Sequence, residues 1–186
     1  MRIEAADSAS LRSGEISNLT FSDIDFEAST INIRTKEQTE DSWAWQPKGG
    51  RDRQVPLSAK LHNLLLQRMM ELSEGFPYTF LSEKRYWTLR GRIGRINERV
   101  RCRPDENWTR PFKRILEKAG IKKGKFHDLC KTFLTRWLKS MPYQELHRLA
   151  GHSDIQTTLT YYTAVGSDYI DRARAIGATG LEPATS

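Results

Sequence analysis

Alternation of apolar and polar residues, the pattern typical of β-strands, is concentrated in one part of this chain. It occurs in three short segments that are rich in β-branched and aromatic residues. Gly49 and Gly50 predict a turn between the second and third of them. Because the segments follow one another closely, the sequence predicts one small antiparallel sheet of three strands near the amino-terminal end. The segments are Thr30–Arg34, Trp43–Trp45 and Arg53–Leu57.

Helical spacing dominates the rest of the chain. After Ser58, which is a residue type that caps helices, Leu61, Leu65 and Met69 recur about once per turn, and Gly75 follows the last of these turns. A loop is expected at Thr20–Asp25. We therefore expect an α+β fold that is mostly helical. Further helices are expected at Ser8–Leu19, through Leu116 to Ala119, and at Asp128–Lys139, Pro142–Ala150, Ile155–Thr163 and Asp168–Ile176.

The composition narrows the classes of function. The chain has 186 residues, a formal charge of +7 and a pI of about 9.5. A basic excess favours a polyanionic partner, because each lysine or arginine that neutralises a phosphate releases a counterion. Nucleic acid is the leading candidate, with an anionic membrane surface as the other. No apolar run reaches the roughly 20 residues of a membrane span, and Cys102 and Cys130 form no metal-binding motif. We expect a cytoplasmic protein with no membrane partner, no metal and no other cofactor.

Four motifs follow one another along the chain, and they contain the residues from which a cationic phosphate site can be built. They are L-R-S-G-E-I at Leu11–Ile16, K-G-G-R-D-R-Q-V-P-L at Lys48–Leu57, H-D-L-C-K-T-F at His127–Phe133 and L-A-G-H-S-D-I-Q-T-T-L-T-Y-Y at Leu149–Tyr162. In this order they resemble the catalytic domain of the tyrosine recombinase (phage integrase) family. The resemblance implies a site-specific DNA recombinase or integrase of a mobile genetic element, which acts through a 3′-phosphotyrosyl intermediate.

The resemblance also implies roles for individual residues. Arg12 would bind the non-bridging phosphate oxygens, a task that suits the planar guanidinium fork. Glu15 lies three residues further on and would hold that fork in place. Lys48, immediately before the Gly-Gly turn, would protonate the departing 5′ oxygen. Lys36 is the second candidate for this acid.

Two histidines and a tyrosine complete the implied site. His127 and His152 would donate hydrogen bonds to phosphate oxygens. Tyr161 lies nine residues after His152, at the spacing of the family's nucleophile. Tyr162 is the alternative nucleophile, and adjacent helical side chains point about 100° apart, so only one of the two tyrosines can face the site.

One position departs from the family pattern. The family's H-x-x-R is H-D-L-C here, so Cys130 stands in place of the second phosphate-binding arginine. A neutral thiol offers at most one weak hydrogen bond, and loss of one preorganised donor costs about 3–4 kcal/mol of transition-state stabilisation. Impaired catalysis is therefore expected. A catalytically inactive DNA-binding remnant of an integrase and a topoisomerase-like enzyme that nicks and rejoins DNA are the alternatives.

The resemblance extends to partners and domains. Duplex DNA is expected on a basic face that includes Arg95, Arg99 and Arg110, and an active form would assemble as a homotetramer on DNA. Residues 1–176 are expected to form the catalytic domain, and residues 177–186 a disordered tail. The amino-terminal core-binding domain of the family is expected to be absent, which would make the chain a fragment of a longer enzyme.

Overall fold

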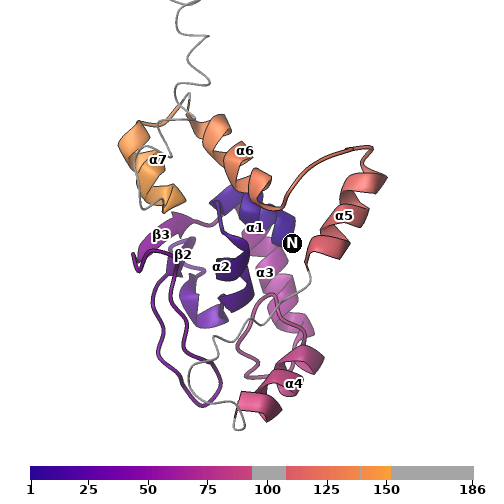
Figure 1. The fold of residues 1–186 in the computed structure, drawn as a ribbon. Helices are drawn as coiled ribbons and strands as arrows, with labels where there is room; N and C mark the ends of the chain where they lie inside the picture. Colours follow the sequence, from indigo (N-terminus) through magenta and orange to yellow (C-terminus); the bar gives the residue numbers. More distant parts are fainter. Residues whose placement is uncertain (94–107, 139, 152–186) are drawn as a thin grey trace, which may run out of the picture.

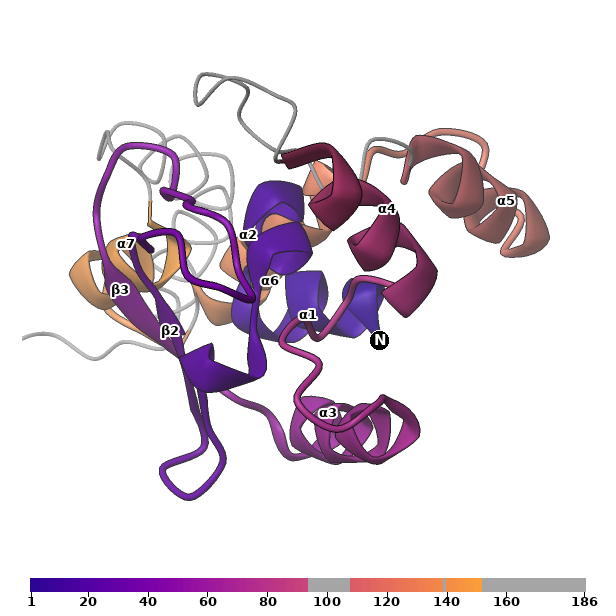
Figure 2. The ribbon, with the colours of Figure 1, turned by 90° about the horizontal axis from the view of Figure 1, so that it is seen from below.

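The computed structural model of the chain describes residues 1–93, 108–138 and 140–151. Helices pack with one small antiparallel sheet (Figure 1), which confirms the expected fold class. Both views place α7 beside the sheet and α5 on the opposite side of the molecule (Figures 1 and 2). The elements are α1 (Arg2–Ala9), α2 (Ser13–Asn18), the 3-10 helix η1 (Phe21–Asp23), β1 (Ile24–Asp25), β2 (Thr30–Ile33), β3 (Arg53–Pro56), α3 (Ala59–Glu71), α4 (Glu83–Ile93), α5 (Thr109–Lys118), α6 (His127–Trp137) and α7 (Tyr143–Ala150).

The sheet has the order β1-β2-β3, and both strand pairs are antiparallel. Ile31 of β2 lies opposite Ile24 on one side and Val55 on the other. All three side chains are buried, so this row forms the face of the sheet that packs on the core. β2 and β3 were expected from the sequence, whereas β1 falls in the segment that was expected to be a loop.

The prediction of a strand at Trp43–Trp45 was wrong. Trp43 instead buries its ring against Tyr78, with centroids 4.3 Å apart, and its indole N–H donates to the side-chain oxygen of Asn18 at 3.0 Å. Trp45 forms an isolated bridge with Lys36 outside the sheet. The aromatic residues that suggested a strand therefore serve side-chain packing.

The expectation of one helix over Ser8–Leu19 was wrong, because α1 (Arg2–Ala9) ends near the start of this range and α2 begins only at Ser13. Ser10 has a φ of 52°, in the left-handed region, and it ends α1. The chain is extended at Arg12, where the side chain of Glu15 accepts a hydrogen bond from the Arg12 backbone N–H at 2.8 Å and so caps the start of α2. Serines and a glycine near the break are weak helix formers, which lowers the cost of interrupting the helix. As a result, Arg12 stands at the amino-terminal end of α2 instead of inside a helix.

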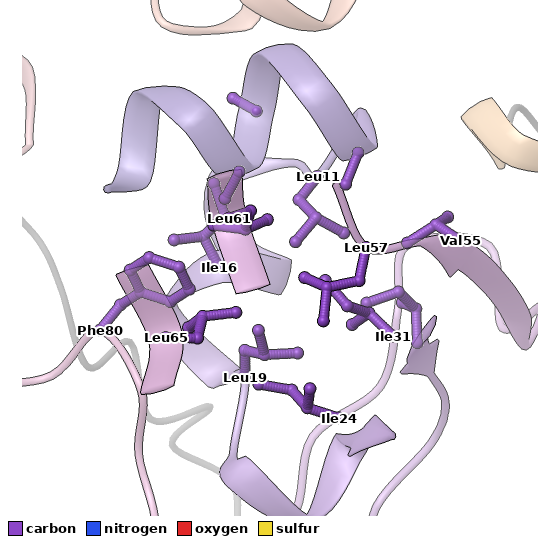
Figure 3. Packing of buried hydrophobic residues seen from close by; sticks show 14 of the residues in the cluster. Leu11, Ile16, Leu19, Ile24, Ile31, Val55, Leu57, Leu61, Leu65 and Phe80 are labelled. Carbon is purple, nitrogen blue, oxygen red and sulfur yellow. The ribbon is translucent and has the colours of Figure 1, made fainter. Parts of the chain in front are cut away.

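A cluster of aliphatic side chains holds α2 in place (Figure 3). Leu11, Ile16, Ile31, Leu61 and Leu65 are all at most 1% exposed. Each such side chain contributes roughly 1.5–3 kcal/mol when it is buried. Because Leu11 and Ile16 are packed on either side of Arg12 and Glu15 in the sequence, this core fixes the place of both charged residues.

Two further helical regions agree with the sequence. The hydroxyl of Ser58 accepts a hydrogen bond from the Leu61 N–H at 3.2 Å and caps α3. α6 and α7 pack on each other through buried residues that include Phe133, Leu134 and Leu146. No helix in the described part of the chain is long and apolar enough to cross a membrane. The helices expected at Ile155–Thr163 and Asp168–Ile176 lie outside the described residues.

Candidate active site

The carboxylate of Glu15 lies buried at the centre of a charged cluster, where its side chain is 2% exposed. Its Oε2 accepts hydrogen bonds from the Arg12 backbone N–H and from Arg53 Nη2, both at 2.8 Å. Its Oε1 accepts from Arg53 Nη1 at 2.8 Å and from Arg12 Nη1 at 3.3 Å. One carboxylate therefore orients two guanidinium groups, and the expected contact between Glu15 and Arg12 is present.

Arg12 has a second anchor on the far side of its guanidinium. Its Nη2 donates to the carbonyl oxygen of Gly151 at 2.7 Å. Gly151 ends α7 in the left-handed conformation, with a φ of 61°. The Arg12 side chain is still 20% exposed, so a charged donor reaches solvent from a fixed position, as a phosphate-binding residue requires. His152 follows Gly151 directly in the sequence and lies outside the described residues.

His127 is the first residue of α6 and is exposed. Its pKa lies below the ordinary value of 6.5 because of partial burial and because of the positive charges of Lys131, Arg12 and Lys48; the negative charge of Asp128 acts in the opposite direction. The imidazole is therefore neutral at physiological pH. The positive charges of Arg12 and Lys48 therefore both act on the pKa of His127.

The two lysines considered for the acid differ in environment. Lys48 is exposed, beside a turn in which Gly49 and Gly50 have positive φ angles. Lys36 is half-buried, and its ammonium group donates to the Asn18 carbonyl at 2.7 Å and to the carboxylate of Asp23. Burial lowers the pKa of Lys36, while Asp23 acts to raise it. Lys36 is thus engaged in the packing of the sheet, which leaves Lys48 as the candidate acid.

Cys130 lies one turn into α6 and is buried, with 4% of its surface exposed. Its thiol donates a hydrogen bond to the Leu11 carbonyl at 3.4 Å. Burial, with a further contribution from the negative charge of Glu15, raises the pKa of Cys130 to about 11. Cys130 is therefore an uncharged thiol that is packed into the core.

The remaining predicted residues are not joined to this cluster by described contacts. Arg110 lies exposed on α5. Within the described residues, no group of three His, Cys, Asp or Glu side chains lies close enough to hold a metal ion. The predicted residues that lie outside the described ranges are Arg95, Arg99, His152, Tyr161 and Tyr162.

Arg53 is the member of the cluster to which the sequence analysis gave no role. A signal was nevertheless present, because alternation along β3 places Arg53 on the same face as Val55 and, just beyond the strand, Leu57. Both of these residues are buried. An arginine at an inward-facing strand position requires a buried anionic partner, since an unpaired charge is costly to bury. Glu15 is that partner.

Comparisons with known proteins identify the family of the chain. Residues 2–167 match the Phage integrase family, and the chain belongs to this family. A relative named tyrosine recombinase XerC-like, from Caldanaerobacter subterraneus subsp. tengcongensis, is 28% identical over 175 residues, which cover 83% of this chain and 42% of the relative. The chain spans about half the length of the curated relatives that it matches.

Solved structures share the fold. The crystal structure of XerA recombinase has a TM-score of 0.60 and 22% identity, over 92% of this chain and 60% of that chain. The Tn1549 transposon integrase in complex with a circular intermediate DNA has a TM-score of 0.59 and 22% identity, over 86% of this chain and 52% of that chain. The fold is thus that of tyrosine recombinase catalytic domains.

Proposed function

We propose that this chain is the catalytic domain of a site-specific DNA recombinase that acts through a 3′-phosphotyrosyl intermediate. The observation that carries the proposal is the buried carboxylate of Glu15, which holds the partly exposed guanidinium of Arg12 in place. A fixed guanidinium, an ammonium and a neutral imidazole are suited to a phosphodiester, which offers non-bridging oxygens to bind and a leaving oxygen to protonate. Family membership and the names of the relatives support the same reaction.

In the proposed reaction, the phenolic oxygen of Tyr161 attacks the scissile phosphorus and gives its proton to solvent. The bond from phosphorus to the 5′ oxygen breaks, and Lys48 donates the proton that this oxygen takes up. Arg12 and His127 donate hydrogen bonds to the non-bridging oxygens, together with His152. A 5′ hydroxyl then attacks the same phosphorus and gives its proton to Lys48, the bond from phosphorus to the Tyr161 oxygen breaks, and the phenol takes a proton back from solvent. Because that bond retains the energy of the phosphodiester, the rejoining step needs no nucleotide cofactor. Tyr162 is the alternative nucleophile.

Duplex DNA is the proposed substrate, and an active form would assemble as a homotetramer on two sites in the cytoplasm. The basic residues Arg95, Arg99 and Arg110 would add contacts to the phosphate backbone. The proposed catalytic domain comprises residues 1–176. Integration or excision of a mobile element is the corresponding biological role.

A second candidate function is a DNA-binding protein without catalytic activity, and the environment of Cys130 favours it. A buried thiol with a pKa of about 11 supplies no positive charge where the family pattern has an arginine. We propose that this substitution impairs the cleavage step. Binding to DNA depends on many exposed lysines and arginines, so it is expected to survive the loss of one catalytic contact.

A suicide-substrate assay distinguishes the two functions. The substrate is a nicked duplex from the flanks of the gene. After cleavage, the short strand that carries the free 5′ hydroxyl diffuses away, so the covalent intermediate is trapped. The amount of DNA-linked protein is then measured on a denaturing gel. Cys130→Arg and Tyr161→Phe are compared with the unchanged protein. Cys102→Arg adds the same charge at the other cysteine and is the matched control, and Tyr162→Phe tests the alternative nucleophile.

An adduct in the unchanged protein that Tyr161→Phe abolishes supports recombinase chemistry despite Cys130. An adduct that forms after Cys130→Arg, and not after Cys102→Arg, identifies a recombinase impaired at one position. If DNA is bound but none of the proteins forms an adduct, the catalytic proposal is wrong and the binding function stands.

A further inference from the structure

Arg53 is a buried arginine that joins three elements of the fold. Its side chain is 6% exposed and belongs to β3. Nη1 and Nη2 donate to the two oxygens of Glu15 in α2, each at 2.8 Å. Nε donates to the carbonyl oxygen of Leu149 in α7 at 3.0 Å. One rigid guanidinium therefore fixes the distance between the start of α2 and the end of α7.

The same guanidinium packs against the turn that ends α7. A Cβ atom built on Gly151 would lie 2.8 Å from Arg53 Cζ, so a side chain at this position would displace the guanidinium of Arg53. On its other side, the carbonyl group of Gly151 accepts a hydrogen bond from Arg12. The backbone of Gly151 thus lies between the two arginines and leads directly into His152 in the sequence.

Arg53 also contributes its positive charge to the cluster around Glu15. Glu15 is buried and pairs with both guanidinium groups, so the cluster carries one net positive charge. Without Arg53, Arg12 alone would neutralise the carboxylate and would have no net charge to offer a phosphate. Cys130 does not supply the missing charge, because its thiol is neutral in this environment.

We propose that Arg53 is a positioning residue, which neutralises Glu15 and ties it to the end of α7, so that the guanidinium of Arg12 is held ready for the scissile phosphate. This inference rests on the proposed function of Arg12. Arginine is required because a lysine is a point donor and does not span both oxygens of Glu15 together with the Leu149 carbonyl.

The first test needs no DNA. The pKa of His127 reports the charge of Arg12, which acts to lower it. It is measured by NMR titration of the histidine ring in the full chain, with His127→Gln to assign the signal. Arg53→Lys keeps the charge but not the geometry, and Arg53→Met removes both. Arg51→Lys and Arg51→Met make the same changes at an exposed residue of the same motif, and they serve as matched controls.

We expect the pKa of His127 to rise toward its ordinary value in Arg53→Lys, in Arg53→Met and in Arg12→Gln, and to stay unchanged in both Arg51 variants. If Arg53 acts through Arg12, adding Arg53→Lys to Arg12→Gln produces no further rise. An unchanged pKa of His127 in Arg53→Lys, or a rise that adds in full to that of Arg12→Gln, overturns the proposal. Arg53→Lys retains the charge and the long aliphatic stem, so it provides the test even if Arg53→Met does not fold.

The second test uses the nicked duplex. Arg53→Lys is expected to slow adduct formation by about 100-fold, the cost of misplacing a catalytic group by roughly 1 Å, while the affinity for DNA stays close to that of the unchanged protein. Equal losses of affinity and rate would show a merely structural role. If neither the unchanged protein nor Cys130→Arg forms an adduct, the proposed chemistry fails, and the His127 titration still decides the role of Arg53.

Discussion

At the scale of single residues, two buried carboxylates, Glu15 and Asp23, hold the basic side chains that surround them. Glu15 holds Arg12 and Arg53, and Asp23 accepts from Lys36. Removing one member of a buried ion pair typically costs about 3–5 kcal/mol, because a charge is left without a partner. Cys130, beside the first of these groups, is instead stabilised as a neutral thiol.

The stability of the protein should therefore fall at high pH because of Cys130. Its pKa is raised from 9.0 to about 11 in the folded state. Between these values the unfolded chain has lost the thiol proton and the folded chain has kept it, so the free energy of unfolding decreases as pH rises. This difference between the two pKa values corresponds to a loss of about 2–3 kcal/mol in the free energy of unfolding. Urea unfolding at pH 8.5 and pH 10.5 measures the loss, and Cys130→Ala should show a smaller one. An equal loss in both proteins would contradict this assignment.

At the scale of elements, helix ends place the site. Arg12 stands at the start of α2, His127 is the first residue of α6, and Gly151 ends α7. Side chains at helix ends are held by backbone capping as well as by packing, which gives them defined positions at the surface. α3 contributes differently, because its Leu61 and Leu65 complete the core beneath α2.

The cap of α3 is the element-scale prediction. Replacing Ser58 by alanine removes the acceptor for the Leu61 N–H and should lower the free energy of unfolding by about 1 kcal/mol. Ser58→Asp retains an acceptor and is the matched control. Chemical denaturation of both variants provides the comparison. A destabilisation by Ser58→Asp equal to that of Ser58→Ala would show that capping is not the cause.

At the scale of the whole molecule, the charge of +7 predicts that the proposed binding to DNA is sensitive to salt. Arg110 is exposed on α5, and a contact to one phosphate contributes about 0.9 to the slope of log K against log salt. Arg110→Ala should reduce the slope by about this amount, as measured by fluorescence anisotropy of labelled duplex. Arg136 is the control, because Asp7 already neutralises it through two hydrogen bonds of 3.1 Å. If Arg110→Ala and Arg136→Ala change the slope equally, Arg110 does not contact a phosphate of the DNA.

The features that could be predicted from the sequence are local in origin. Alternation predicted β2 and β3, helical spacing and Ser58 predicted α3, and the motifs brought Arg12, Lys48 and His127 into one proposed site. Local patterns were less reliable where side-chain packing competes with them, as at Trp43, whose ring stacks on Tyr78, and at the left-handed Ser10, which splits the first helix.

Only the tertiary structure decided how the charges are shared. Arg53 and Glu15 are 38 residues apart, and Arg12 and Gly151 are 139 apart. Such pairs have no periodic signature, because they form only after the core has brought α2, β3 and α7 together. The inward direction of Arg53 was readable from strand alternation, but its partner was not. The structure likewise showed that Cys130 is buried, since burial depends on packing against the Leu11 carbonyl on another segment.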